Sequence, residues 1–95
     1  MQIDLTEKEW QINKSVLSQY PFAFYAFGSR VKKTAKKYSD LDLCYKENIP
    51  DSVVAKIEED FIESDLPFKV DIVNWKNCSA DFQKLIAENI IPLKF

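Results

Sequence analysis

The spacing of apolar residues along this chain changes several times between a helical period and a strand period. Apolar positions three and four apart predict helices over residues 6–19, 52–64 and 80–90. Thr6 and Glu9 stand three positions apart at the start of the first of these, which is the spacing of a capping box. The polar and basic residues 29–39 are compatible with a short helix followed by a loop.

Other short segments have the apolar density or the strict alternation that is typical of β-strands. Residues 21–27 are aromatic and end before the only glycine, residues 40–45 alternate polar and apolar side chains, and residues 68–75 are rich in β-branched ones. The segment of residues 90–95 is too short to predict its secondary structure. Helices that alternate with strands predict a single α/β domain over residues 1–95, in which helices cover a small sheet.

The composition narrows the possible chemistry. The 95 residues contain no histidine, which excludes Ser-His or Cys-His nucleophilic catalysis and histidine-bound zinc. A net charge of −2 gives no reason to expect general affinity for nucleic acid. Catalysis would therefore have to use carboxylates, lysines, hydroxyl groups, a thiol or a bound metal.

The cysteines and the N-terminal residues bear on the compartment. Cys44 and Cys78 form no CxxC pair, so we expect reduced thiols, buried as small core residues, in a cytoplasmic protein. The first ten residues include acids and no apolar run of the kind found in signal peptides. The longest apolar segment is far shorter than the roughly 18 residues that indicate a membrane span, so no membrane association is expected.

The only glycine of the chain, Gly28, stands at the end of the first predicted strand and is followed by Ser29 and Arg30. Glycine allows a backbone to approach a ligand closely or to adopt a positive φ. A junction between a strand and a helix also presents free amides, which favour a phosphate group. This turn is a candidate phosphate-binding site, although an ordinary strand-to-helix turn has the same pattern.

Two aspartates in the second predicted strand break the usual composition of strands. Asp40 and Asp42 are two positions apart, which places both on one face, about 6.5–7 Å apart along the strand. Carboxylates held side by side repel each other, and a divalent cation such as Mg²⁺ relieves that repulsion. The alternative is a solvated polar face on an edge strand.

A third aspartate, Asp71, lies inside the apolar segment of the last predicted strand. A buried acid is costly unless it is paired, hydrogen-bonded or bound to a metal. Lys69 on the same face is one possible partner. If this strand lies beside the second one, Asp71 instead joins Asp40 and Asp42, and three carboxylates near a phosphate turn are what two Mg²⁺ ions need to clamp a triphosphate.

Between these motifs lies a basic segment whose lysines are most simply interpreted as a solvated surface. It contains Arg30, Lys32, Lys33, Lys36 and Lys37. The arginine adjoins the phosphate turn and is the member that we expect to contact a ligand. Nucleic-acid binding by these lysines is another hypothesis, and it predicts a strongly salt-dependent affinity for DNA or RNA.

Taken together, Phe27-Gly28-Ser29, ten intervening residues, Asp40-Leu41-Asp42-Leu43 and a later Asp71 resemble the signature of polymerase-β-like nucleotidyltransferases. The length is similar to that of the minimal nucleotidyltransferase branch. The resemblance implies an α/β (α+β) domain with a small mixed sheet flanked by helices. The sequence departs from the family pattern after the turn, where Val31-Lys32-Lys33 follows Arg30 without a second glycine.

The resemblance also implies roles for the residues. Gly28 and Ser29 would contact the nucleotide phosphates, Asp40 and Asp42 would hold two Mg²⁺ ions, and Asp71 would bind one ion and accept the proton of the incoming hydroxyl. The implied reaction moves a nucleoside monophosphate, AMP if the donor is ATP, to a hydroxyl. Members of the branch commonly pair with a helical HEPN-domain protein as the antitoxin of a toxin–antitoxin pair, and some transfer AMP to its tyrosine.

A second hypothesis remains open at this point. The domain would bind a nucleotide without catalysis and neutralise a helical partner by forming a complex. Trp10, Trp75 or residues 90–95 would then supply an apolar interface, whereas simple core packing of the tryptophans is the alternative.

Overall fold

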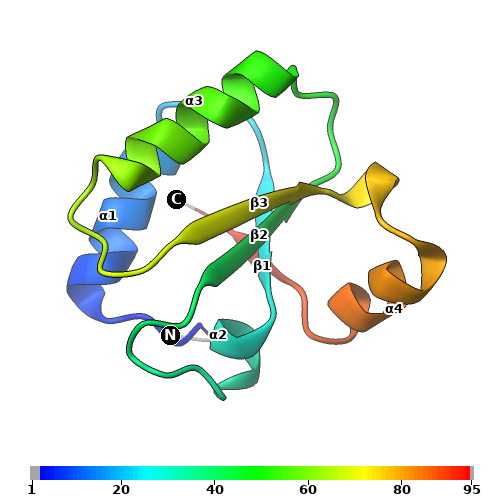
Figure 1. Ribbon diagram of the computed structural model, residues 1–95, viewed down its shortest axis with the longest axis horizontal. Helices are drawn as coiled ribbons and strands as arrows, with labels where there is room; N and C mark the ends of the chain where they lie inside the picture. Colours follow the sequence, from blue (N-terminus) through cyan, green and yellow to red (C-terminus); the bar gives the residue numbers. More distant parts are fainter. Residues whose placement is uncertain (1–2, 95) are drawn as a thin grey trace.

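A mixed sheet with strand order β3-β2-β1-β4 forms the centre of the molecule (Figure 1). The computed structural model describes residues 3–94. β2 and β3 are parallel, whereas β1 is antiparallel to both of its neighbours. The mixed α/β architecture expected from the sequence is therefore confirmed. The strands are β1 (Phe24–Phe27), β2 (Leu41–Tyr45), β3 (Val70–Asn74) and β4 (Ile91–Leu93).

The first and the last helix each begin at a residue whose side chain caps the helix. Thr6 Oγ1 accepts a hydrogen bond from the Glu9 amide at 3.2 Å, and Glu9 Oε1 accepts one from the Thr6 amide at 2.9 Å, so the predicted capping box is present. Ser79 Oγ accepts from the amide of Phe82 and caps the last helix. The helices are α1 (Glu7–Leu17), α2 (Ser29–Lys32), α3 (Asp51–Ile62) and α4 (Ala80–Glu88), with a 3-10 turn at Trp75–Asn77.

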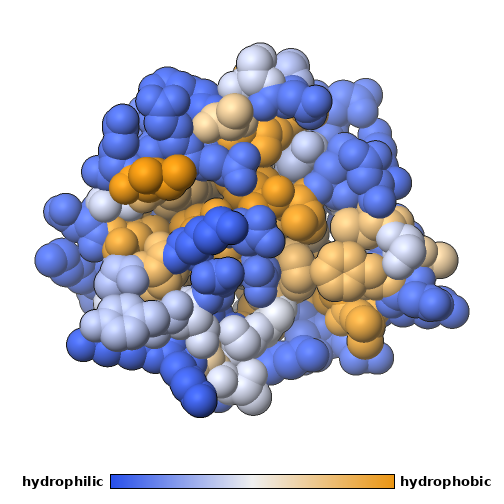
Figure 2. All heavy atoms as spheres, in the orientation of Figure 1, coloured by the Kyte–Doolittle hydropathy of each residue, from blue (hydrophilic) through white to orange (hydrophobic). Residues whose placement is uncertain are grey.

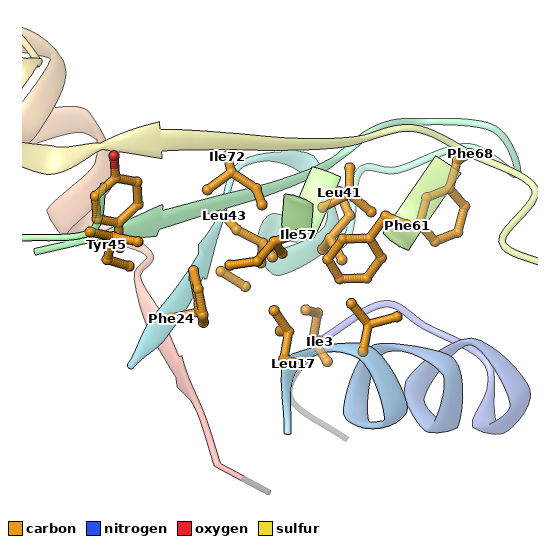
Figure 3. Close-up of a cluster of buried hydrophobic side chains, with 14 residues drawn as sticks. Ile3, Leu17, Phe24, Leu41, Leu43, Tyr45, Ile57, Phe61, Phe68 and Ile72 are labelled. Carbon is orange, nitrogen blue, oxygen red and sulfur yellow. The ribbon is translucent and has the colours of Figure 1, made fainter. Parts of the chain in front are cut away.

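The two faces of the sheet carry separate apolar clusters. α1 and α3 lie on one face and α4 lies on the other (Figure 1). On the first face Leu41, Leu43 and Ile72 of the strands point toward Leu17 of α1 and Ile57 of α3 (Figure 3). Because side chains alternate along a strand, the neighbours of these residues face α4. A smaller cluster there contains Phe27, Cys44 and Ile86.

The ends of the strands differ from the predictions for local reasons. Asp40 lies one residue before β2, although the Leu41 amide already donates to the Lys69 carbonyl at 2.9 Å. β3 ends at Asn74 because its side chain accepts from the Lys76 amide and starts the 3-10 turn. β4 comes from the segment that the sequence left uninterpreted, and it forms by pairing with β1.

Several smaller expectations are also answered by the described residues. Cys44 is fully buried, Cys78 is partly buried, and both are free thiols. Trp10 and Trp75 are partly buried and pack against the two clusters, as the core-packing interpretation expected. Within residues 3–94, no helix combines the length and the apolar character required to cross a bilayer.

Candidate active site

Asp42 and Asp71 lie directly opposite each other on the parallel strands β2 and β3. Neighbouring strands are about 4.8 Å apart and paired residues share a face, so these carboxylates are close neighbours on the α4 side of the sheet. Lys69, the alternative partner of Asp71, forms no ion pair with it. The parallel register therefore brings together two acids that are 29 positions apart in the sequence.

The position of Asp42 is unfavourable for its negative charge. The pKa of the Asp42 carboxyl is raised from 3.8 to about 6, mainly by burial and in addition by the negative charges of Asp71 and Asp40. Burial of a carboxylate among like charges costs free energy unless a cation or a hydrogen-bond donor compensates it. Such a cost is typical of sites that bind a ligand.

Gly28 is adjacent to the Asp42 carboxylate, and this position has no room for a side chain. Its φ is +82°, a backbone conformation that residues with a side chain rarely adopt. A Cβ at this position would stand 2.5 Å from Asp42 Oδ2. The special backbone position expected for this glycine is therefore present, because it connects β1 to α2 with a positive φ and leaves room for the Asp42 carboxylate.

A cavity of about 370 Å³ opens beside these groups. This volume lies within the roughly 300–1,000 Å³ range of ligand-binding clefts. The polar part of its lining comes from α2 and the starts of β2 and β3, and the apolar part comes from α4 and the adjoining strand positions. The lining residues are Phe27, Gly28, Lys32, Asp42, Asp71, Val73, Phe82, Leu85 and Ile86.

Two further predicted site residues lie beside this cavity without lining it. Asp40 is exposed just before β2, and it is near enough for its charge to raise the pKa of Asp42. Ser29 is the first residue of α2, where the opening amides of a helix have no partner within the helix. The structure therefore brings Asp42, Asp71 and Gly28 together and leaves Asp40 and Ser29 at the margin.

Arg30 occupies a different place from the ligand contact that we expected. Its side chain is only 4% exposed, and its guanidinium lies 3.8 Å from the centre of the Phe68 ring. The guanidinium nitrogens donate to the carbonyl oxygens of Asp4 at 2.8 Å and of Ser39 at 2.9 Å, with longer bonds to the loop before it. Arg30 therefore holds the connection that leads to Asp40 instead of facing the cavity.

The contribution of Lys32 and of α4 to the cavity has no signal in the sequence pattern. Lys32, expected to be a solvated lysine, is indeed exposed, but it also lines the cavity together with Asp42 and Asp71. Phe82 and Leu85 are among the apolar positions whose spacing predicts the helix over residues 80–90. Their exposure, 40% and 56%, was not visible from the sequence, because helical spacing does not say how much of an apolar face is covered.

The carboxylates of Asp42 and Asp71 are suitable ligands for a divalent cation. Within residues 3–94 no three acidic or thiol side chains are arranged to hold a metal ion by themselves. Mg²⁺, however, is commonly held by one or two carboxylates together with the phosphates of a substrate. Asp42 and Asp71 are two such hard oxygen donors, and their mutual repulsion favours a cation between them.

Comparison with known proteins identifies relatives of this chain. Residues 11–93 match the family described as polymerase beta, nucleotidyltransferase. The probable protein adenylyltransferase MntA of Haemophilus influenzae is 44% identical over 97 residues, which cover 98% of this chain and 85% of the relative.

Solved structures share the fold at lower sequence identity. A chain in a crystal structure of a toxin–antitoxin with AMP-PNP superposes with a TM-score of 0.68 at 19% identity, covering 90% of this chain and 72% of the other. A chain from a mutant form of the toxin–antitoxin MntA-HpeT has a TM-score of 0.63 at 20% identity, covering 95% and 72%. With its family match over most of its length, this chain belongs to the polymerase-β-like nucleotidyltransferases, in their minimal branch, and is an enzyme of that family.

Proposed function

We propose that this protein is a Mg²⁺-dependent protein adenylyltransferase that transfers AMP from ATP to a hydroxyl group of a partner protein. The observation that carries the proposal is the pair Asp42 and Asp71, which face each other beside the glycine turn in one cavity. The name of the relative at 44% identity, a probable protein adenylyltransferase, supports the choice of reaction.

In the proposed reaction the hydroxyl oxygen attacks the α-phosphorus of ATP. A new P–O bond forms while the bond to the β-phosphate oxygen breaks, and pyrophosphate leaves. By the resemblance to the family, Asp71 accepts the proton of the hydroxyl, which agrees with the need for a base other than histidine in this chain. The backbone at Gly28 and Ser29 holds the phosphates, with Lys32 at the same edge of the cavity.

Asp42 and Asp71 would hold Mg²⁺ directly, with Asp40 beside them. The ion would supply charge neutralisation of the triphosphate, as in other phosphoryl and nucleotidyl transfers. For the chain itself the consequence would be electrostatic, because a bound cation would offset the repulsion between the two carboxylates. Two ions are our prediction from the resemblance and from the number of acids.

The acceptor in this proposal is a tyrosine of a helical HEPN-domain toxin, with this chain as the antitoxin. The solved neighbours come from toxin–antitoxin structures, one of them with AMP-PNP, which supports a nucleotide and a toxin as partners. We place the reaction in the cytoplasm, where ATP and reduced thiols such as Cys44 and Cys78 both occur.

The test is to incubate the protein and its HEPN partner with Mg²⁺ and ATP that carries a label on either the α- or the γ-phosphate. Transfer of AMP leaves the α-label on the partner and never the γ-label. Asp42→Asn and Asp71→Asn should abolish labelling, and a tyrosine-to-phenylalanine change in the partner should remove the acceptor. Asp65→Asn, at an exposed loop position, is the matched control and should retain full transfer.

The outcomes separate the two hypotheses for this fold. Full labelling by both site variants would refute the proposed mechanism. A tight complex of the two proteins without any α-label would instead support a non-catalytic antitoxin that acts by binding. Retention of the γ-label would indicate phosphoryl transfer rather than nucleotidyl transfer.

A further inference from the structure

The cavity has two chemically distinct halves. Gly28, Lys32, Asp42 and Asp71 form a polar half, for which the proposed function already assigns the triphosphate. The other half is wholly apolar and is assigned no role by that function. It is lined by Phe27, Val73, Phe82, Leu85 and Ile86.

The exposed part of this apolar half lies on α4. Phe82 and Leu85 are 40% and 56% exposed, whereas Ile86 beside them is buried and anchors the helix to the sheet. Figure 2 shows apolar side chains at the surface over α4. Large apolar side chains left open beside a cleft are a common mark of a ligand-binding surface.

The ring of Phe82 is held in place by the strand that leads to the glycine turn. It packs edge-on against Phe27, with 6.1 Å between ring centres and an angle of 82° between the planes. Phe27 directly precedes Gly28, so the aromatic wall and the phosphate turn belong to one rigid connection. A ligand that extends from the turn across the cavity therefore meets the apolar side chains of α4.

We infer that Phe82 and Leu85 bind the base of the nucleotide and that they do so with little regard to which base it is. The inference rests on the proposed function, which places the phosphates in the polar half. A nucleoside triphosphate carries its charge at one end and a flat, weakly polar ring at the other, and the two halves of the cavity match these ends. Stacking of a base on an aromatic side chain contributes about 1–3 kcal/mol to the binding free energy.

The lack of base selectivity follows from the side chains of the apolar half. Its five lining residues, all within the described chain, have hydrocarbon side chains without a hydrogen-bond donor or acceptor. Strong discrimination requires buried polar groups that are left unpaired by the wrong substrate, whereas an apolar wall distinguishes ligands mainly by size. ATP and GTP should therefore bind within about tenfold of each other.

The experiment measures binding of MgATP, MgGTP and magnesium tripolyphosphate by titration calorimetry. Phe82→Ala should weaken the binding of both nucleotides by about 5- to 100-fold. Leu85→Ala should weaken the binding of both nucleotides by a smaller factor. The binding of tripolyphosphate, which has no base, should stay within about twofold, since its contacts are to the polar half. Ile62→Ala is the control, because Ile62 is 81% exposed on α3 and does not line this cavity.

Leu85→Ala also guards against loss of folding, since this side chain is the more exposed of the two. Equal weakening of ATP and tripolyphosphate by both variants would overturn the inference, and so would a preference for ATP over GTP above about 100-fold. Unchanged ATP binding with lost labelling of the partner would show that α4 docks the acceptor protein instead. In each of these cases AMP transfer by the wild-type protein persists, so the proposed function would survive.

Discussion

Replacement of Asp42 should stabilise this protein at neutral pH while it removes the activity. In the folded protein the pKa of the Asp42 carboxyl is raised to about 6 from 3.8, first by burial and then by the charges of Asp71 and Asp40. A carboxyl whose pKa is higher in the folded state than in the unfolded state opposes folding once it is ionised. This penalty is absent below about pH 4, grows as the pH rises to 6, and is complete above it.

The size of the effect follows from the shift. A change of about two pKa units corresponds to about 3 kcal/mol, and partial access of water to this half-buried group reduces the expected cost to about 1–2 kcal/mol. Asp42→Asn removes the charge and keeps the shape of the side chain. For a domain of this size the melting temperature at pH 7 should rise by roughly 4–15 °C.

The assay is thermal unfolding with a chelator present at pH 4, 5, 6, 7 and 8, for the wild type, Asp42→Asn and the exposed control Asp65→Asn. We expect the gain from Asp42→Asn to be small at pH 4 and to reach its full size near pH 7, while the control changes little. Addition of Mg²⁺ and ATP should stabilise the wild type and not Asp42→Asn, since ligand binds only the intact site. A gain that is the same at pH 4 and pH 7, or a loss at pH 7, would refute the electrostatic explanation.

Three further changes test separate parts of the site. Gly28→Ala places a Cβ against Asp42 Oδ2 and strains the backbone, so we expect a loss of about 1–3 kcal/mol in unfolding free energy and at least tenfold less AMP transfer; normal transfer would contradict the role of the turn. In Arg30→Lys the lysine cannot reproduce the forked hydrogen bonds to several carbonyl oxygens, so chemical denaturation should show a free energy of unfolding lower by about 2–3 kcal/mol. A decrease below about 0.5 kcal/mol would argue that these contacts do not stabilise the fold. Lys32→Met should weaken tripolyphosphate binding by about fivefold or more at low salt and leave the melting temperature nearly unchanged; equal binding by the variant in calorimetry would remove this lysine from the site.

Agreement between sequence and structure is best where the signal is local. The capping box at Thr6 and Glu9 depends on neighbours in the chain and is seen in the structure. The same holds for the helix predicted over residues 52–64, which is seen at Asp51–Ile62, and for the strand predicted over residues 40–45, which is seen at Leu41–Tyr45. Gly28 was also recognisable, because a single glycine at a strand end restricts the backbone in a way that only its immediate neighbours need to explain.

What the sequence determined by itself is therefore the order of elements, the glycine turn and the set of acids from which a site could be built. Tertiary structure alone decided which acids meet, because the parallel register of β2 and β3 places Asp71 opposite Asp42 and leaves Asp40 before the strand. Tertiary structure also decided that Arg30 points inward to backbone carbonyl oxygens, which the local sequence pattern does not predict, and that Lys32 lines the cavity. The reason is physical: pairing between distant segments and the burial of a side chain depend on what packs against it, which the spacing of residues in one segment does not contain.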